Sequence, residues 1–400
     1  MSAHHTAPRR AYNAGLAPGR VLILCGSLLG AAAGSLAATQ ATPAPAAPRG
    51  ERLETRAEAA RASGRLDEAV ALYREALAAS PRWAEGLWAL GTIVYDQDRF
   101  AECRDVFARL SALQPKLAPA WALRGLCEFR LGAYAKARAH LETALGLGLP
   151  AQEDLGRVAF YHEALLLVRD SAFDRAIAPL HTVLQFGPPT PELETACGLV
   201  LLRRPLLPAD VPAASSELVR RVGQAYCAHL ARHPETALPL FEALVREHPR
   251  QRFMHYGYGL ALAQQGSAEA LDQFAKEIEL FPDDVLARVE LGFGLLTRGR
   301  EAEAIAPARE AARLAPGLFA THLVLGRALA ASGSLAEGVH ELETAATLAP
   351  AIPAVQLALA RAYAQAGRKA DAGRANAAFQ ALEAARHGPS DAARPAPESP

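Results

Sequence analysis

Residues 282–350 read PDDVLARVELGFGLLTRGREAEAIAPAREAARLAPGLFATHLVLGRALAASGSLAEGVHELETAATLAP, and this stretch contains one pattern twice. Pro282, Pro316 and Pro350 stand at intervals of 34 residues, and a Leu-Gly pair recurs at Gly292 and Gly326. Within each copy the small and apolar residues follow helical spacing in two runs that a turn separates. A period of this length is typical of stacked supersecondary units. The stretch therefore predicts two successive helical hairpins.

This pattern resembles the tetratricopeptide repeat in its period and in its order of Leu-Gly, Ala, Ala and Pro. The resemblance extends over residues 51–386, where the pattern recurs with the prolines Pro81 and Pro115 in the first part of the chain. It implies an all-α fold, a right-handed α-solenoid of about nine helical hairpins. In such an array each hairpin packs only against its neighbours. The family resemblance also implies protein–protein interaction.

The domain organisation follows from where the pattern is clear and where it fades. We expect a signal peptide or signal anchor at 1–38, a Pro/Ala linker at 39–50, repeats one to four at 51–188, a degenerate repeat with a Pro-rich insert at 189–249, repeats six to nine at 250–386, and a disordered tail at 387–400. In the degenerate part we pair 215–232 with 235–248 as one hairpin. Leu206 and Leu207 of the insert are expected to fold back and seal a gap, with an exposed docking loop as the alternative.

The N-terminal segment predicts export. Residues 1–50 carry four arginines and no acidic residue, and an apolar run extends from Val21 to Ala38. A basic start, an apolar run and small residues near its end are typical of a secretory signal peptide. We therefore expect a periplasmic or secreted protein. Because this run is at the short end of a membrane span, an uncleaved anchor in the inner membrane is the alternative.

Composition excludes several partners. The formal net charge is zero, so no overall field attracts nucleic acid, and contact with a membrane is expected only through residues 21–38.

Five cysteines are present, and none forms a Cys-x-x-Cys pair. Cys103 and Cys127 fall on small-residue faces of predicted helices, where a buried thiol packs as a small apolar group. We interpret them as packing residues, although export would permit a disulfide.

No catalytic motif is apparent in the sequence. There is no nucleophile elbow, phosphate loop or dinucleotide fingerprint. His229 and His233 stand four residues apart on one predicted helix, which is the spacing of a metal pair, but the segment lacks the glutamate of a zinc protease and a third ligand. We therefore predict no enzyme, no cofactor and no metal site.

The candidate binding site is a second stripe along the first helix of each hairpin. It lies one residue beyond the packing stripe, about 100° around the helix, and in stacked hairpins of this kind it lines the concave surface. The stripe ends in two arginines at equivalent positions, which could hold a carboxylate. The Lys and Asn residues that form the carboxylate clamp of chaperone-binding family members are missing. The predicted groove residues are Trp88, Tyr95, Leu126, Phe129, Tyr161, Tyr256, Phe293, Arg327 and Arg361.

Two functions fit this sequence. The first is an extracytoplasmic scaffold that binds a peptide or protein segment in its groove. The second is a cell-envelope assembly factor that docks partners by its convex face or edges. In the second case the aromatic stripe only covers the inner turn of the array. The sequence does not identify the partner.

Overall fold

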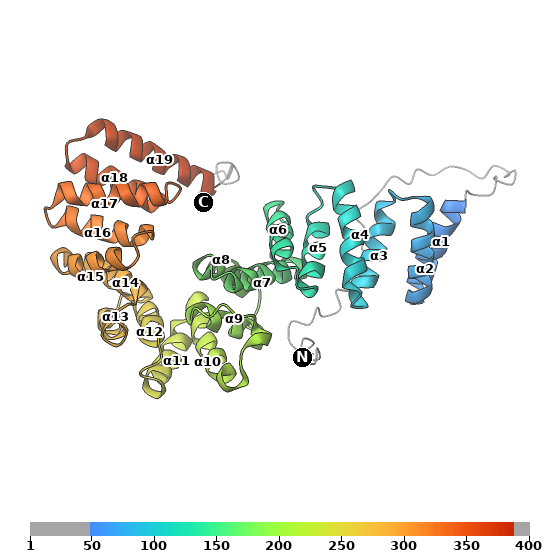
Figure 1. Cartoon of the computed structure of the whole chain (residues 1–400), viewed down its shortest axis with the longest axis horizontal. Coiled ribbons are helices and arrows are strands. Elements are labelled where there is room, and N and C mark those ends of the chain that lie inside the picture. Colours follow the sequence, from blue (N-terminus) through green and yellow to red (C-terminus); the bar gives the residue numbers. More distant parts are fainter. Residues whose placement is uncertain (1–48, 388–400) are drawn as a thin grey trace, which may run out of the picture. The chain divides into compact units, whose positions relative to one another are not determined.

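The computed structural model describes residues 49–387, and its side chains are described for residues 52–385. In this part of the chain all regular structure is helical, which confirms the all-α solenoid prediction (Figure 1). The chain divides into two compact units at Ala231. The first unit holds α1 (Arg49–Ala62), α2 (Leu66–Ala79), α3 (Ala84–Asp96), α4 (Phe100–Leu113), α5 (Ala118–Arg130), α6 (Tyr134–Gly146), α7 (Asp154–Arg169), α8 (Phe173–Leu184), α9 (Pro191–Leu201), the short 3₁₀ helix η1 (Pro208–Asp210) and α10 (Ala213–Leu230).

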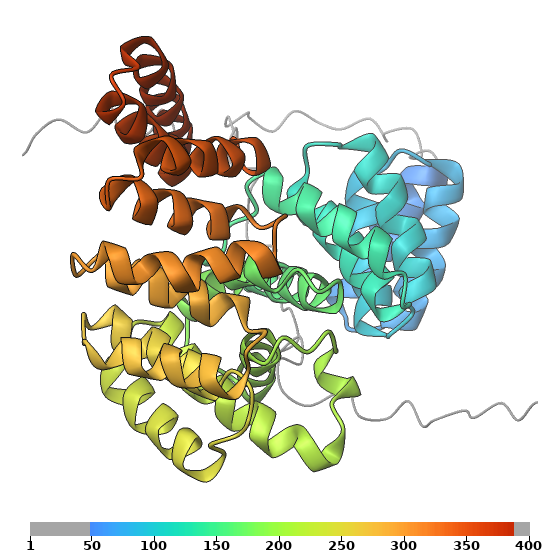
Figure 2. The same ribbon diagram turned by 60° about the vertical axis from the view of Figure 1, so that its left-hand side comes forward.

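The second unit holds α11 (Pro234–Glu247), α12 (Met254–Gln264), α13 (Glu269–Leu280), α14 (Val285–Leu296), α15 (Glu301–Leu314), α16 (Phe319–Ala331), α17 (Leu335–Leu348), α18 (Pro353–Gln365) and α19 (Lys369–His387). The helices from α12 to α19 form four hairpins: α12–α13, α14–α15, α16–α17 and α18–α19. Helix α11 packs against α12, the first helix of the first of these hairpins. Figure 2 shows these antiparallel pairs, coloured yellow to red, in successive layers.

A left-handed residue joins the two helices of each hairpin. Gly64 and Gly132 take this conformation in the first unit, with φ of 73° and 76°. Asp98 lies midway between them in the sequence and adopts φ of 57°. Glycine enters this region without the steric penalty of a Cβ, and Asp tolerates it better than most residues do. The same sequence position therefore ends the first helix in successive repeats.

Large buried side chains fill the space between helices at a constant repeat position. Tyr73, Phe107 and Leu141 stand 34 residues apart, and each is fully buried. A Cβ built on Gly91 would lie 2.7 Å from the Phe107 ring. One on Gly125 would lie 2.9 Å from Leu141. The glycines thus make room for the large residue of the facing helix.

The pairing predicted for residues 215–248 is wrong. Helix α10 pairs with α9 across the Pro-rich insert, and α11 opens the second unit and packs against α12. Gly198 and Gly223 explain this pairing, because a Cβ on Gly198 would overlap the Val219 carbonyl of α10. Glycine on both helices allows their backbones to approach more closely than other residues permit. Of the two leucines of the insert, Leu207 is buried, as we expected, and Leu206 is half-buried.

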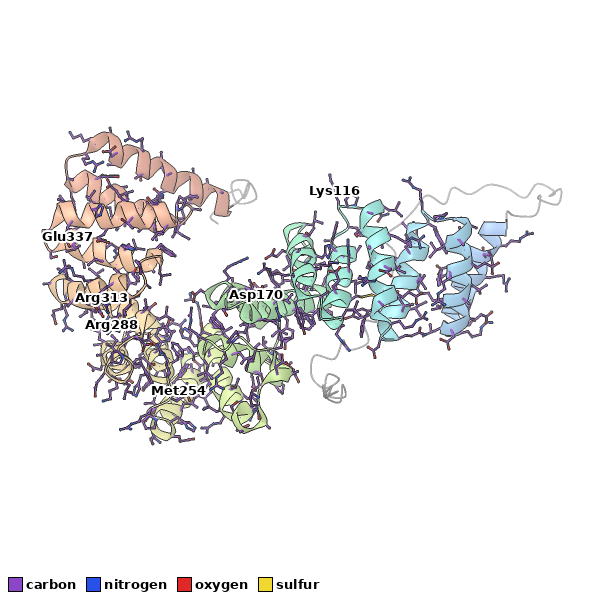
Figure 3. The ribbon with its side chains drawn as sticks, in the orientation of Figure 1. Lys116, Asp170, Met254, Arg288, Arg313 and Glu337 are labelled. Carbon is purple, nitrogen blue, oxygen red and sulfur yellow. A yellow bond between two sulfur atoms is a disulfide. The ribbon has the colours of Figure 1, made fainter. Side chains whose placement is uncertain are left out.

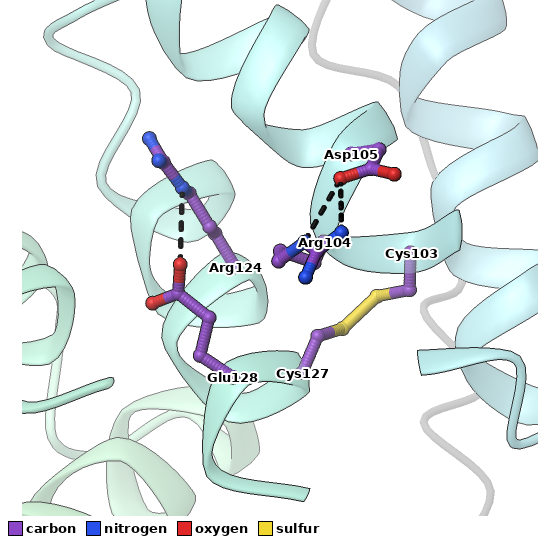
Figure 4. The surroundings of a disulfide bond; sticks show 6 residues. All are labelled: Cys103, Arg104, Asp105, Arg124, Cys127 and Glu128. Carbon is purple, nitrogen blue, oxygen red and sulfur yellow. Dashed lines mark hydrogen bonds and ion pairs between the residues drawn. A yellow bond between two sulfur atoms is a disulfide. The ribbon is translucent and has the colours of Figure 1, made fainter. Parts of the chain in front are cut away.

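A disulfide joins successive hairpins of the first unit. Cys103 of α4 is bonded to Cys127 of α5, with their Cα atoms 6.3 Å apart (Figure 4). Our interpretation of the two cysteines as packing thiols is therefore wrong. Sequence separation gave no indication of the bond, because the two residues meet only when one hairpin stacks on the next.

No helix among the described residues is long and apolar enough to cross a membrane. The apolar run at 21–38, residues 39–48 of the linker and residues 388–400 of the tail lie outside the described residues, whereas α1 already begins at Arg49 and α19 ends at His387.

Candidate functional site

The first helices of the second unit define one side of its stack. Among the first helices, α12 contacts α14, α14 contacts α16, and α16 contacts α18. The second helices α13, α15 and α17 do not contact one another to a comparable extent. The first helices are therefore closer together and form the inner side of this unit. On the outer side, a pocket of about 540 Å³ opens between α13 and α15, and Arg288 of α14 forms part of its lining. Figure 3 labels Arg288.

Two predicted arginines meet in a pocket on the inner side. Arg327 of α16 and Arg361 of α18 line a cavity of about 240 Å³. Its remaining walls are mainly alanine and leucine, with one amide at Gln365. Because the two arginines occupy the same position in successive repeats, the stacking of α16 on α18 brings them together. The pocket combines an apolar lining with two positive charges at its rim.

The electrostatics of this pocket favour an anion. Arg327 lies above the Phe293 ring, with its Cζ atom 5.5 Å from the ring centroid. Burial and the neighbouring charge of Arg361 both lower the pKa of the Arg327 guanidinium, which still remains protonated at neutral pH. Both side chains are exposed to solvent, and two neighbouring like charges repel one another. An anionic ligand would relieve this repulsion.

Neither arginine has a counterion among the described residues. No ion pair or hydrogen bond joins Arg327 or Arg361 to a carboxylate there, whereas arginines of the second helices are paired. Arg309 donates to Glu337 at 2.7 Å, and Arg313 pairs with Glu310 at 2.6 Å. Figure 3 labels Arg313 and Glu337 on these helices. The two pocket arginines are thus available to a ligand.

The other predicted groove residues divide into two groups. Trp88, Tyr256 and Phe293 are half-buried, so part of each ring is accessible. The second group is buried and packs between helices: Tyr95, Leu126, Phe129 and Tyr161. Phe129, for example, contacts the His162 ring at 4.7 Å between centroids. In the first unit the aromatic stripe is therefore mostly covered, and a partner has access to Trp88 alone among the predicted positions there.

Sequence reasoning missed the second wall of the arginine pocket. Ala354, Leu357, Ala358 and Gln365 of α18 line it together with Arg361. These residues follow the three- and four-residue spacing of one helix face. That spacing is visible in the sequence, but four small or uncharged residues carry no chemical motif that would single them out.

The histidine pair does not form the arrangement that the sequence suggested. Helix α10 ends at Leu230, so His229 is in its last turn, and His233 precedes α11. His229 stacks on the Tyr226 ring, and His233 hydrogen-bonds Glu235. The prediction of one shared helix is wrong because Arg232 adopts a left-handed conformation that ends the helix. Among the described residues no group of three or more His, Cys, Asp or Glu side chains is placed to hold a metal ion.

Comparison with known families identifies the repeats. Models of the tetratricopeptide repeat match residues 60–127 in the first unit, and residues 231–270 and 264–318 in the second. Both units of the chain therefore contain tetratricopeptide repeats. Repeats of this family form protein–protein interaction scaffolds, and this is the class of function that the fold defines.

Several solved structures resemble part of the chain. MamA from Desulfovibrio magneticus RS-1 is 21% identical, with a TM-score of 0.38 over 41% of this chain and 93% of that one. MamA of strain MSR-1 is 19% identical, with a TM-score of 0.36 over 43% and 99% of the two chains. MamA of strain AMB-1 is 22% identical, with a TM-score of 0.35 over 39% and 93%. No curated protein is significantly similar to this chain.

Proposed function

We propose that the second unit binds a segment of a partner protein along its inner side, with a carboxylate of that segment held between Arg327 and Arg361. The observation that supports this proposal most directly is the pair of arginines that share one pocket without a counterion. Guanidinium groups bind carboxylates through paired, charge-assisted hydrogen bonds. The alanine-rich walls leave room for a small apolar side chain next to the carboxylate.

Phe293 and Tyr256 extend this surface toward the N-terminal end of the second unit. Both rings are half-buried and belong to the first helices of their hairpins, and the Phe293 ring also packs against the Arg327 guanidinium. Partly exposed aromatic rings contribute large contact areas with little loss of side-chain entropy. An extended segment anchored at the arginines would continue over these rings.

The test is capture of a partner from the cell envelope by cross-linking. Arg327→Glu with Arg361→Glu should weaken capture on the order of 100-fold, because two charge-assisted interactions become repulsive. The matched control is Arg309→Glu with Arg313→Glu, which makes the same change of charge in exposed ion pairs that contribute little to stability. Capture that survives in the pocket variant would reject the anchor, and capture lost in both variants would point to a general effect of charge.

The alternative is docking on the outer side of the array. Pockets of about 500 and 540 Å³ lie between successive second helices, at α2–α4 and at α13–α15. A partner that binds there would be unaffected by the Arg327 and Arg361 substitutions. It would be weakened when the exposed Arg300, which lines the outer pocket of the second unit, is replaced by Glu.

We also propose that the chain is exported and acts in the periplasm or outside the cell, with residues 21–38 as an uncleaved inner-membrane anchor as the alternative. The acid-free N-terminal segment with its apolar run supports export. The Cys103–Cys127 disulfide agrees with it, because such bonds persist mainly in oxidising compartments. Alkaline phosphatase fused after residue 60 should be active if the chain is exported. An inactive fusion that accumulates in the cytoplasm would contradict export.

A further inference from the structure

The tightest helix pair of the first unit contains two more cysteines. Cys197 lies in α9 and Cys227 in α10, and both are free and fully buried. They belong to the hairpin that encloses the Pro-rich insert. Neither the groove nor the disulfide between Cys103 and Cys127 involves them.

Backbone geometry brings these two thiols together. Gly198 and Gly223 allow the helices to touch, and a Cβ on Gly223 would overlap the Glu194 carbonyl. The Cys227 sulfur lies 3.9 Å from the Leu193 carbonyl oxygen. In an α-helix that carbonyl accepts the amide hydrogen of the residue four positions on, which here is Cys197. The Cys227 sulfur is therefore at the same turn of α9 as Cys197.

The two thiols also influence each other. Burial raises the pKa of the Cys227 thiol, and the neighbouring Cys197 thiol raises it further. Raising the pKa also makes the folded, buried dithiol slow to react, because the thiolate is the nucleophile in disulfide exchange.

We propose that Cys197 and Cys227 form a second disulfide when the chain folds under oxidising conditions. In this step a thiolate from one cysteine attacks a small disulfide such as oxidised glutathione and forms a mixed disulfide, releasing one glutathione. The other cysteine then attacks the protein sulfur of the mixed disulfide and expels the second glutathione. One S–S bond forms in the protein, the S–S bond of glutathione breaks, and two reduced glutathione molecules leave with the electrons and protons. Exchange occurs before α9 and α10 close, when both sulfurs are accessible.

This bond would fasten the α9–α10 hairpin across the insert at 204–212. Cross-linking two helices reduces the number of conformations open to the unfolded chain and so stabilises the folded one. The redox state of the pair would then set the stability of the last hairpin of the first unit. The inference does not depend on the proposed binding function.

The experiment is peptide mapping of the full chain after refolding in a glutathione redox buffer. Free thiols are blocked in denaturant, and the protein is digested with trypsin without reduction. Cys197 and Cys227 fall in the peptides 176–203 and 222–232, which contain no other cysteine, and Cys103 and Cys127 fall in 100–104 and 125–130. We expect the first two peptides to be recovered as one cross-linked species. Recovery of both in blocked form, while the other pair is cross-linked, would overturn the proposal.

A melting experiment provides the second readout. In Cys103→Ala with Cys127→Ala, the remaining reductant-sensitive bond is the proposed one, so adding reductant should lower Tm by several degrees. In the matched variant, in which Cys103, Cys127, Cys197 and Cys227 are all replaced by alanine, reductant should leave Tm unchanged. A Tm of the first variant that is insensitive to reductant would contradict the second disulfide.

Discussion

At the scale of single residues, Glu277 takes the place of a helix cap. Its carboxylate accepts hydrogen bonds from the Phe253 amide at 2.6 Å and the Tyr256 amide at 3.1 Å. Phe253 is the N-cap residue of α12 and Tyr256 is in its first turn, and the N-cap residue supplies no side-chain hydrogen bond of its own. Phe253 adopts a left-handed conformation, with φ of 69°, that points its amide at the carboxylate. Glu277 of α13 thus ties the two helices of this hairpin together.

We predict that Glu277 makes the protein less stable as pH rises. Burial, helped by Asp284, raises the pKa of Glu277 to about 7, although the two amides and Arg252 act in the opposite direction. The folded state therefore keeps this proton up to about pH 7, whereas the unfolded chain releases it near pH 4.5. The proton that Glu277 retains in the folded state therefore stabilises the protein fully below pH 4.5. As pH rises from 4.5 to 7, this stabilisation is lost, and the free energy of unfolding falls by roughly 3 kcal/mol.

The variant Glu277→Gln tests this linkage, because an amide does not titrate in this range. Gln can accept one of the two hydrogen bonds, so the variant should be less stable than the wild type at pH 5. At pH 8 the difference in Tm, followed by circular dichroism, should be smaller. An equal difference at both pH values would show that Glu277 does not titrate between them.

At the scale of helices, glycine has opposite effects at different positions. A Cβ on Gly326 would lie 2.7 Å from Leu342 and 2.9 Å from the Gly338 carbonyl oxygen, which cannot move aside without shifting α17. Overpacking of this kind costs about 1–3 kcal/mol. Gly373 is also helical, in α19, and a Cβ there would meet no atom within 4 Å.

We therefore predict that Gly326→Ala lowers the stability of the protein and that Gly373→Ala raises it by up to about 1 kcal/mol, since alanine is the better helix former. Thermal melts of the two variants beside the wild type measure both effects. Equal shifts of the same sign would mean that helix propensity alone, and no packing constraint, determines the outcome at Gly326.

At the scale of the whole molecule, we predict that the two units unfold in separate transitions. Each unit has its own internal contacts, and in an array a repeat is stabilised mainly by its neighbours. All three tryptophans, Trp83, Trp88 and Trp121, and the disulfide belong to the first unit. Tryptophan fluorescence therefore reports on that unit, whereas circular dichroism reports on both.

Denaturant unfolding followed by both signals tests this prediction. Reductant should lower the denaturant concentration at the midpoint of the fluorescence transition, which reports on the first unit. The part of the circular dichroism transition that comes from the second unit should stay unchanged. Transitions that coincide and shift together on reduction would show that the chain unfolds as one cooperative body.

The amino-acid sequence by itself determined the class of fold. Helical periodicity, a regular proline spacing and recurring glycines act within one or two neighbouring hairpins, so the repeat period alone marks Tyr73, Phe107 and Leu141 as equivalent core positions. The same regularity put Arg327 and Arg361 at equivalent places. The pattern failed where the repeats degenerate, and there the pairing of α9 with α10 depended on the contact between Gly198 and Gly223.

Only the tertiary structure decided which side chains remain accessible and which distant residues meet. Tyr95 and Phe129 share the predicted stripe with Phe293, but they are buried because neighbouring rings cover them. Cys103 and Cys127 become bonded through the stacking of one hairpin on the next. The periodicity of one helix fixes the direction of a side chain, but its exposure depends on the shapes of the residues that another hairpin places against it.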